Sequence, residues 1–421
     1  MDLSRDAADD LDARDPLAGF RSRFTGTGDD GPGRPLYLDG NSLGRLPAET
    51  PAAVAEVVQQ EWGHGLVGSW ADWVQRSRRI GDLLAAGVLG ARPGEVLLSD
   101  STSVNLYKLL VAAADARPDR DVLVCCADDF PTDRYVVAGA AGSRRMTVRE
   151  VPADIDDGLD LDVLAAALDE RVAVVVLSQV AYRSGALVDI ATVTRLARDA
   201  GALVVWDLSH GAGAVPADLT GAGADLAVGC TYKYLNGGPG APAFLYVRRE
   251  LQEELRQPIW GWFGQRDQFA MGPVYQPADG VDRFAVGTPP VLGMAAVEVG
   301  ARLSAEAGIE RLAAKGQALT GLLVALADAW LAGHGVTVAS PRDAARRGSH
   351  VSLAHPAAWQ LTQALVDRGV VPDFRTPDRV RFGPAPLYTR FVDVWDAMDR
   401  LRTVLVEGAH EAYPTERSRV T

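Results

Sequence analysis

Two stretches of the chain decide its fold: Leu203 to Asp207, which reads LVVWD, and Leu226 to Lys233, which reads LAVGCTYK. Each begins with a short apolar run, typical of a buried strand, and ends in polar residues. In open α/β sheets, ligands bind outside the carboxyl ends of the strands. Asp207 and Lys233 are therefore expected to face one ligand.

The same alternation of apolar runs and helical segments continues on both sides of these stretches. The predicted strands are Val96–Leu98, Val122–Cys126, Val172–Leu177, Leu203–Trp206, Leu226–Val228 and Ala243–Val247, and the predicted helices between them are Val104–Ala114, Leu161–Leu168 and Ile190–Ala200. Strands separated by helices indicate a mostly parallel sheet that is covered on both faces. We assign this large α/β domain to residues 61–290.

The remainder of the chain predicts a second, smaller α+β domain, formed by residues 34–60 together with 291–421. A long helical stretch, broken near Ala307-Gly308, is followed by short strands and helices; the strands are predicted at Val336–Ala339, Val351–Leu353 and Val380–Phe382, and the helices at Ala357–Asp367 and Val392–Val406. Residues 1–33 are polar, without period, and are predicted to form a flexible N-terminal arm.

Composition and charge exclude several classes of partner. The 421 residues carry 42 basic and 55 acidic side chains, a net charge of −13 that repels the phosphate backbone of nucleic acids. The longest apolar run, Val172 to Leu177, is far shorter than the ~20 residues of a membrane span. Neither nucleic acid nor a membrane is expected as a partner.

Cysteine and histidine usage argues against disulfides and metal sites. The three cysteines, Cys125, Cys126 and Cys230, include an adjacent pair and form no disulfide framework, which favours a cytoplasmic location. His350 and His355 are five residues apart, off the spacing of a helical metal-binding pair. No metal is predicted.

Lysine is rare in this sequence, and that rarity sharpens the search for chemistry. The only lysines are Lys108, Lys233 and Lys315, and the first and third are expected on helix surfaces. A lysine and an aspartate at neighbouring strand ends match the two ends of pyridoxal phosphate (PLP): an amine that forms an imine, and a carboxylate that pairs with the pyridinium nitrogen. Taken singly, Asp207 could be a helix cap and Lys233 a loop charge.

A phosphate site is predicted at the start of the first helix of the large domain. Val96 to Leu98 leads through Ser99-Asp100 into Ser101-Thr102-Ser103, where free backbone N–H groups, the helix dipole and hydroxyl groups would bind an anion. The alternative is an ordinary Ser/Thr helix cap.

Several longer motifs resemble those of kynureninases, in the family's order from about residue 35 to 405. They are YLDGNSLG (37–44), FPTD (130–133), DLSHGAGAVP (207–216), GCTYKYLNGGPG (229–240), GWFG (261–264), DFR (373–375) and RFGPAPLY (381–388). The resemblance implies PLP-dependent transferase fold type I, the aspartate aminotransferase-like fold. It also implies hydrolysis of L-kynurenine, or 3-hydroxykynurenine, to anthranilate or 3-hydroxyanthranilate and L-alanine, within tryptophan catabolism, the kynurenine pathway and NAD biosynthesis.

The resemblance also implies roles for individual residues. Lys233 would bind PLP covalently and move the α-proton, and Tyr232 would transfer protons during hydration and cleavage or, alternatively, bind phosphate. The implied cofactor-binding residues are Thr102, Ser103, Phe130, Asp133, Ser178, Asp207, His210, Tyr232, Lys233, Trp262 and Thr288, with Trp262 and Thr288 reaching the phosphate from the second subunit of a homodimer. Those implied for substrate are Arg381 for the α-carboxylate, and Trp70, Gly287 and Thr288 for the aryl end, with Trp73 an alternative to Trp70.

Rival hypotheses remain open at this point. A cysteine desulfurase shares fold and cofactor but needs a nucleophilic cysteine well after the lysine, and none follows Cys230. An aminotransferase would depend on a keto acid, and a non-catalytic relative would act as a binding or regulatory protein. Pro372 stands where the family commonly has glycine, shortly before Arg381, so a ring-substituted kynurenine of a biosynthetic pathway is an alternative substrate.

Overall fold

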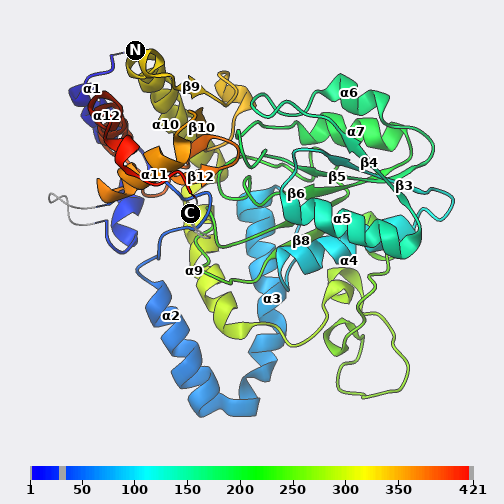
Figure 1. Cartoon of the computed structure of the whole chain (residues 1–421). Helices are drawn as coiled ribbons and strands as arrows, with labels where there is room; N and C mark the ends of the chain where they lie inside the picture. The colour runs from blue at the N-terminus through cyan, green and yellow to red at the C-terminus, as the bar shows by residue number, and fades with distance from the viewer. Residues whose placement is uncertain (1, 28–34, 417–421) are drawn as a thin grey trace.

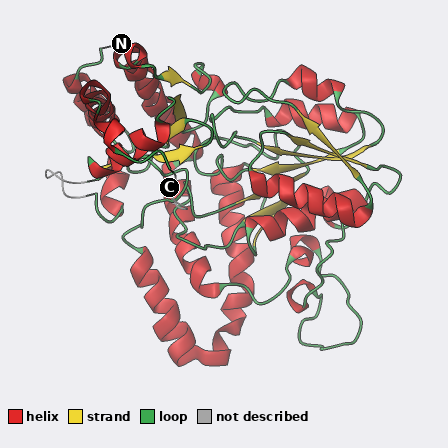
Figure 2. Ribbon diagram, in the orientation of Figure 1, coloured by secondary structure: helices red, strands yellow, loops and turns green. Residues whose placement is uncertain are grey.

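The computed structural model describes residues 2–27 and 35–416 and is built around one seven-stranded sheet (Figure 2). In spatial order the strands are β2 (Val96–Leu98), β8 (Phe244–Val247), β7 (Leu226–Gly229), β6 (Leu203–Asp207), β5 (Val172–Ser178), β3 (Val122–Cys126) and β4 (Thr147–Val151). Only β8 runs against its neighbours, β7 and β2; the other adjacent pairs are parallel. The mostly parallel sheet is thus confirmed, and the carboxyl ends of the other six strands share one edge.

Helices cover both faces of this sheet (Figure 1). Alternate side chains of β3 point to opposite faces: Leu123 packs with α4 (Thr102–Asp115) and α5 (Pro131–Arg144), whereas Val124 packs with α3 (Trp70–Leu84), α7 (Ile190–Asp199) and α9 (Val291–Ala307). This alternation buries apolar side chains on both sides. The short helices α6 (Leu161–Ala166) and α8 (Arg249–Gln252) complete the layers.

The smaller α+β unit is built on a four-stranded antiparallel sheet with the order β12 (Asp373–Arg375), β13 (Arg379–Phe382), β10 (Val351–Ala354) and β9 (Thr337–Val338). Its core includes α10 (Ile309–Trp330), α11 (Ala358–Asp367) and α12 (Phe391–Glu407). A short strand near the chain start, β1 (Leu36–Tyr37), pairs in parallel with β11 (Val370–Val371), and α2 (Thr50–Glu56) then leads back toward α9. The beginning and the end of the chain thus pack together.

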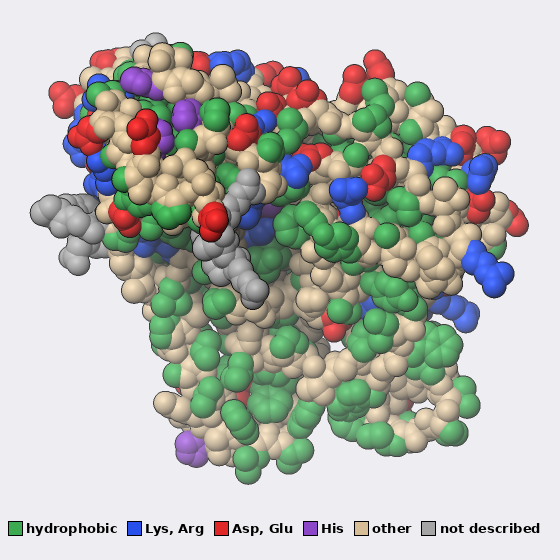
Figure 3. All heavy atoms as spheres, in the orientation of Figure 1, with side chains coloured by type: hydrophobic (Ala, Val, Ile, Leu, Met, Phe, Trp, Pro, Cys, Tyr) green, Lys and Arg blue, Asp and Glu red, His purple; other side chains and the backbone are tan. Residues whose placement is uncertain are grey.

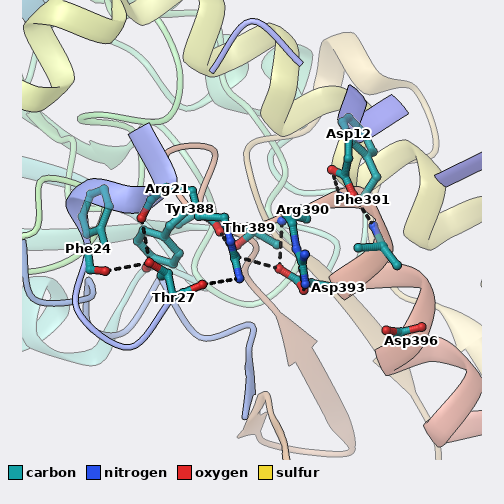
Figure 4. Close-up of polar contacts among 12 residues, drawn as sticks. Asp12, Arg21, Phe24, Thr27, Tyr388, Thr389, Arg390, Phe391, Asp393 and Asp396 are labelled. Carbon is teal, nitrogen blue, oxygen red and sulfur yellow. Dashed lines mark hydrogen bonds and ion pairs between the residues drawn. The ribbon is translucent and has the colours of Figure 1, made fainter. Parts of the chain in front are cut away.

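The N-terminal segment differs from the predicted flexible arm. Arg5–Ala13 forms helix α1, whose Ala8 is buried in the core beside α12. The Asp12 carboxylate accepts hydrogen bonds from the backbone N–H groups of Phe391 (2.7 Å) and Val392 (3.0 Å), so it caps α12 (Figure 4). Asp12, one of the aspartates that make the segment look solvated, thus serves as a helix cap. Residues 1 and 28–33 of the predicted arm lie outside the described residues.

Helix α10 is the one helix among the described residues that is long and apolar enough to span a membrane. Its apolar side chains, among them Leu319, Leu323 and Leu326, are buried in the core of the smaller unit. Because core helices pass the same length and composition test, this burial favours a core role.

Within residues 61–290, the helices α3, α5 and α8 and the strand β4 were not predicted from the sequence. Helix α5 contains Gly139 and Gly142 and few apolar residues, so its helical period is weak. Strand β4 lies at the sheet edge, and its Arg149 and Glu150 interrupt the apolar run expected of a buried strand.

Candidate active site

The carboxyl ends of the parallel strands open into a cavity of about 540 Å³. Ser178 ends β5, Asp207 ends β6, and Lys233 lies in the loop after β7. The predicted site residues that line this one cavity are Thr102, Ser103, Phe130, Asp133, Ser178, Asp207, His210, Tyr232, Lys233 and Thr288. Most of the predicted cofactor residues thus come together in one chain.

Lys233 lies against a neutral histidine. The Nζ atom of Lys233 is 3.1 Å from Nε2 of His210 and 6.0 Å from the centre of the Phe130 ring. Burial, together with the charges of Lys233 and Arg381, holds the pKa of His210 well below its usual value. Because the imidazole stays uncharged, Nε2 can accept a hydrogen bond from the lysine.

Three buried carboxyl groups face the same cavity region. Asp207 and Asp133 line the cavity, and Asp129 lies behind them, accepting hydrogen bonds from the backbone N–H groups of Cys126 (3.0 Å) and Ser178 (3.2 Å). Burial and the charge of Asp207 raise the pKa of Asp133 well above its usual range. The same two causes raise the pKa of Asp129 to about 6. The Asp133 Oδ2 atom is buried without a hydrogen-bond partner. This excess of negative charge suits a cationic ligand group.

The opposite wall of the cavity is an anion cradle. The side chain of Ser101 caps α4 by accepting a hydrogen bond from the Val104 backbone N–H, and Thr102 and Ser103 form the first turn. Thr288 reaches the same cavity from a segment far along the chain. Free N–H groups and the positive end of the helix dipole suit a phosphate.

These features together fit PLP. A lysine amine, carboxylates for a protonated ring nitrogen, an aromatic side chain over the cavity and an anion cradle are the four groups that this cofactor needs. The cavity residues that sequence reasoning missed include Asp100, Thr132 and Ser209, and Asp129 was missed behind them. Thr132 lies within the quoted FPTD motif, so its position gave a usable signal.

Tyr232 lies beside Lys233 on the cavity wall. Burial, and to a lesser extent Cys230, raises the pKa of the Tyr232 hydroxyl, so it stays protonated at neutral pH. A protonated phenol can donate a hydrogen bond or a proton. The geometry is compatible with both roles predicted for it.

A glycine from the chain start supports the lysine loop. The backbone N–H of Gly44 donates to the Tyr232 carbonyl oxygen (2.8 Å), and a Cβ atom at position 44 would collide with the Lys233 carbonyl oxygen. Only glycine fits this close backbone approach.

Arg381 does not line this cavity but lies at the center of a buried cluster in the smaller unit. Its Nε and Nη2 atoms bind the two oxygens of Asp373 at 2.8 and 2.5 Å, and Arg375 binds the same carboxylate at 2.7 Å. Burial acts to raise the pKa of Asp373, but Arg381 and Arg375 hold it below its usual value. The pKa of Asp39, which is buried beside Asp373, rises to about 7. The arginine is thus already paired before any ligand binds.

The aromatic residues predicted for the substrate and the second subunit lie outside the cavity. The Trp70 ring lies 5.7 Å from that of Trp262, between centroids, and the same distance from Trp73. The Trp73 indole N–H donates to Glu61 (2.6 Å), which commits it to the protein. Gly287 lines a neighbouring pocket that also includes Thr288. The contribution of Trp262 and Thr288 to a second chain stays a prediction, and Thr288 lines the cavity of its own chain.

A larger cavity of about 890 Å³ lies near the starts of α6 and α7. Three of its carboxylates have structural partners: Asp160 and Asp189 cap those two helices, and Asp218 accepts from the Gly221 N–H. It contains no lysine. The smaller cavity with Lys233 is therefore the candidate active site. No group of three or more His, Cys, Asp or Glu residues that could hold a metal is found in the part of the chain that the structure describes.

The other two lysines are buried, which corrects the prediction that they lie on helix surfaces. Lys108 pairs with Asp100 at 2.6 Å, and Lys315 pairs with Asp15 at 2.6 Å. Each aspartate compensates a charge that burial alone would exclude.

Comparisons with known proteins agree with this geometry. Residues 312–401 match the family model described as the kynureninase C-terminal domain. The chain is 45% identical over 403 residues to a kynureninase of Pseudomonas fluorescens, covering 94% of each chain, and 45% identical over 419 residues to a kynureninase of Burkholderia pseudomallei, covering 97% of each.

Solved structures confirm the predicted fold. An apo cysteine desulfurase from Thermococcus onnurineus superimposes with a TM-score of 0.80 at 18% identity, covering 93% of this chain and 98% of the other. C-DES, in a mutant with glycine covalently linked to its PLP cofactor, gives the same TM-score and identity, covering 91% and 98%. At this identity the likeness concerns the fold alone, which is that of PLP-dependent fold type I enzymes.

Proposed function

The chain belongs to the kynureninase family, and from this premise we propose that it is a PLP-dependent hydrolase that cleaves the Cβ–Cγ bond of L-kynurenine to anthranilate and L-alanine. The observation that carries the proposal is the single cavity in which Lys233, the Asp133 and Asp207 carboxyl groups and the α4 anion cradle meet. The kynurenine pathway of tryptophan catabolism, which leads toward NAD biosynthesis, is the proposed context.

The residues of the cavity divide the work of holding PLP. Thr102, Ser103 and Thr288 would bind its phosphate, and Phe130 would cover its ring. Asp207, supported by the nearby Asp133, would keep a proton on the ring nitrogen. When bound, PLP supplies an acceptor for the electrons released at the substrate α-carbon.

Lys233 and His210 would handle the first proton. A lysine amine that is free to act as a base can remove the substrate α-proton, and neutral His210, 3.1 Å away, can accept a hydrogen bond from that amine and hold it in place. His210 is thereby a positioning residue.

Cleavage requires water at the substrate γ-carbonyl carbon. Addition of water converts this ketone to a hydrate, and breaking its Cβ–Cγ bond leaves the aryl carboxylic acid, while Cβ gains a proton and ends as the alanine methyl group. Tyr232, protonated and on the cavity wall, would supply and recover a proton at the γ-oxygen.

Arg381 would orient the substrate through its α-carboxylate. A guanidinium suits this task because it presents two parallel donors to a carboxylate. In the described structure those donors bind Asp373, so the substrate must compete with Asp373 or use the remaining N–H groups.

We propose kynurenine, rather than its 3-hydroxy derivative, as the preferred substrate. Trp70 presents an aromatic face near Trp262, Gly287 has no side chain that could hydrogen-bond a ring hydroxyl, and the Thr288 hydroxyl is assigned above to the phosphate. A higher specificity constant for 3-hydroxykynurenine would overturn this preference.

We also propose a cytoplasmic homodimer with shared active sites. Exposed apolar side chains gather on the lower part of the molecule in Figure 3, where Figure 1 places the turn between α2 and α3 and, to its right, the loop between α8 and α9. Those of the turn are Trp62, Leu66 and Val67, and those of the loop are Trp260, Phe269, Met271 and Val274. Apolar surface of this kind suits burial against a second copy. Light scattering coupled to size exclusion would test the dimer, and a monomer at micromolar concentration would contradict it.

The activity test follows the release of the aryl acid. The purified protein, supplied with PLP, is given kynurenine and, separately, 3-hydroxykynurenine, and anthranilate or 3-hydroxyanthranilate fluorescence is recorded. Dependence on an added keto acid would instead indicate an aminotransferase. PLP binding without release from either compound would redirect the search to ring-substituted kynurenines. A desulfurase is disfavoured because all three cysteines are buried and none lies after position 230.

A further inference from the structure

Lys108 is a buried lysine that has no part in the proposed reaction. It lies in α4, its side chain has no exposed surface, and its ammonium group donates to three oxygens. These are Asp100 Oδ2 at 2.6 Å, the Phe284 carbonyl oxygen at 2.8 Å and Ser99 Oγ at 3.4 Å. All three of its donors are therefore occupied.

The partners of Lys108 belong to two different walls of the phosphate cradle. Asp100 directly precedes Ser101, the cap of α4, and itself lines the cavity. Phe284 lies four residues before Thr288, which lines the cavity from the other side. One ammonium group thus ties the start of α4 to the segment that carries Thr288.

The backbone at Asp100 shows why such a tie is needed. Its φ angle of +47° lies in the left-handed region, which a residue other than glycine holds only when its surroundings fix it. Lys108 and the Ser99 hydroxyl, which donates to the same carboxylate oxygen at 2.6 Å, fix its side chain. The orientation of the following N–H groups depends on this turn.

We propose that Lys108 is a positioning residue for cofactor phosphate: it holds the N–H groups at the start of α4 and the hydroxyl of Thr288 in one binding geometry. The proposal rests on the proposed PLP site. Positioning differs from a purely structural role of Lys108 in one measurable respect. It affects only the binding of the cofactor phosphate and not that of the rest of the cofactor.

The test compares two ligands that differ only by that phosphate. Apo wild type and Lys108→Met are titrated with PLP and with pyridoxal, and binding is followed by the change in cofactor absorbance. We expect Lys108→Met to bind PLP about tenfold more weakly, the equivalent of one charge-assisted hydrogen bond, and pyridoxal as tightly as wild type does. Lys315→Met is the matched control, because it breaks another buried Lys–Asp pair, with Asp15, and should change neither affinity.

A double variant separates positioning from simple charge balance. Lys108→Met with Asp100→Asn removes one positive and one negative charge together, and it also avoids leaving Asp100 without a partner should the single variant fold poorly. We expect the same loss of PLP affinity. Recovery to the wild-type value would overturn positioning.

The remaining outcomes are equally decisive. Equal losses for PLP and pyridoxal, or unchanged PLP affinity in Lys108→Met, would overturn the role of Lys108 while leaving the PLP site intact. Wild type that binds pyridoxal as tightly as PLP would overturn the α4 phosphate cradle itself, and with it both proposals.

Discussion

The cavity around Lys233 and the cluster around Arg381 solve the burial of charge in opposite ways. Three carboxyl groups, Asp129, Asp133 and Asp207, lie at the cavity region beside Lys233, and burial, followed by the charge of Asp207, raises the pKa values of Asp129 and Asp133. In the cluster, Arg375 and Arg381 both bind the Asp373 carboxylate directly, and burial together with the charge of Asp373 raises the pKa of the neighbouring Asp39 to about 7.

The two regions therefore make different demands on their ligands. The unbalanced cavity gains stability when a cationic group arrives, so binding there is favoured by charge. In the cluster around Arg381 the guanidinium is already bonded to Asp373. A carboxylate that binds Arg381 must therefore replace or share those bonds. We expect variants in the two regions to affect cofactor and substrate separately.

The largest expected effect comes from removing the lysine of the cavity. Lys233→Ala should lower the release of anthranilate by about 10³-fold or more, because no base remains at that position to move the α-proton. Anthranilate fluorescence measures the rate, and cofactor absorbance checks that PLP still binds. More than about a hundredth of wild-type turnover would contradict a base role for Lys233.

Tyr232→Phe tests proton transfer at the other end of the reaction. Turnover should fall by about 10²-fold, since the phenyl ring keeps the shape but removes the proton. The PLP affinity should stay close to that of wild type. A loss of PLP affinity with unchanged turnover of the loaded enzyme would assign Tyr232 to phosphate binding instead.

Arg381→Lys probes the cluster around Arg381. Losing the two-pronged donor should raise KM for kynurenine roughly thirtyfold, about 2 kcal/mol, because a lysine cannot present two parallel N–H groups. Asp373 keeps Arg375 as a partner, so folding should be retained. Steady-state kinetics and a PLP titration measure the split, and a parallel fall in PLP affinity would break the distinction between the two regions.

The smallest effect is on the pH dependence of apo-protein stability. The pKa of Asp133 is raised in the folded protein, so the folded state holds this proton more tightly than the unfolded state does. The stability that the protonated group contributes is fully present below about pH 4. It is lost as the pH rises through the pKa of Asp133 in the folded protein. Asp133→Asn removes that loss. Between pH 5 and pH 8 the Tm of the apo wild type should therefore fall by roughly 2–4 °C more than that of the variant. Parallel curves, measured by calorimetry without PLP, would show that Asp133 carries no such penalty.

The sequence predicted the sheet, and Asp207, Lys233 and the start of α4 in the cavity, because these depend on local signals. The other predicted cavity residues, Phe130, Asp133, Ser178, His210, Tyr232 and Thr288, were implied by the resemblance to kynureninases. Apolar runs such as Val172 to Leu177 and the polar residues after them mark strands and strand ends without knowledge of the rest of the chain. The edge strand β4 and the glycine-containing helix α5 lack such signals, since their neighbours rather than their composition stabilise them.

Long-range pairing explains what the sequence could not give. Nothing local distinguishes Lys108 from a surface lysine, because its partner Phe284 is 176 residues away. Likewise, Asp12 caps a helix that begins at Phe391. Asp129 was overlooked because its role depends on the Ser178 N–H, which only the folded sheet brings to it.

The approach of Gly44 to the lysine loop has a consequence for how the molecule transmits motion. Hydrogen bonds between backbone groups link Gly383, just after Arg381, to Leu38 and Gly40, and Gly44 of the same segment to Tyr232. This segment therefore connects the strand of Arg381 to the loop of Lys233 through main-chain hydrogen bonds. A shift of the Arg381 strand would therefore displace the main chain of the lysine loop. Residues 61–290, expressed as a separate module, would lack the hydrogen bond from Gly44 that supports this loop.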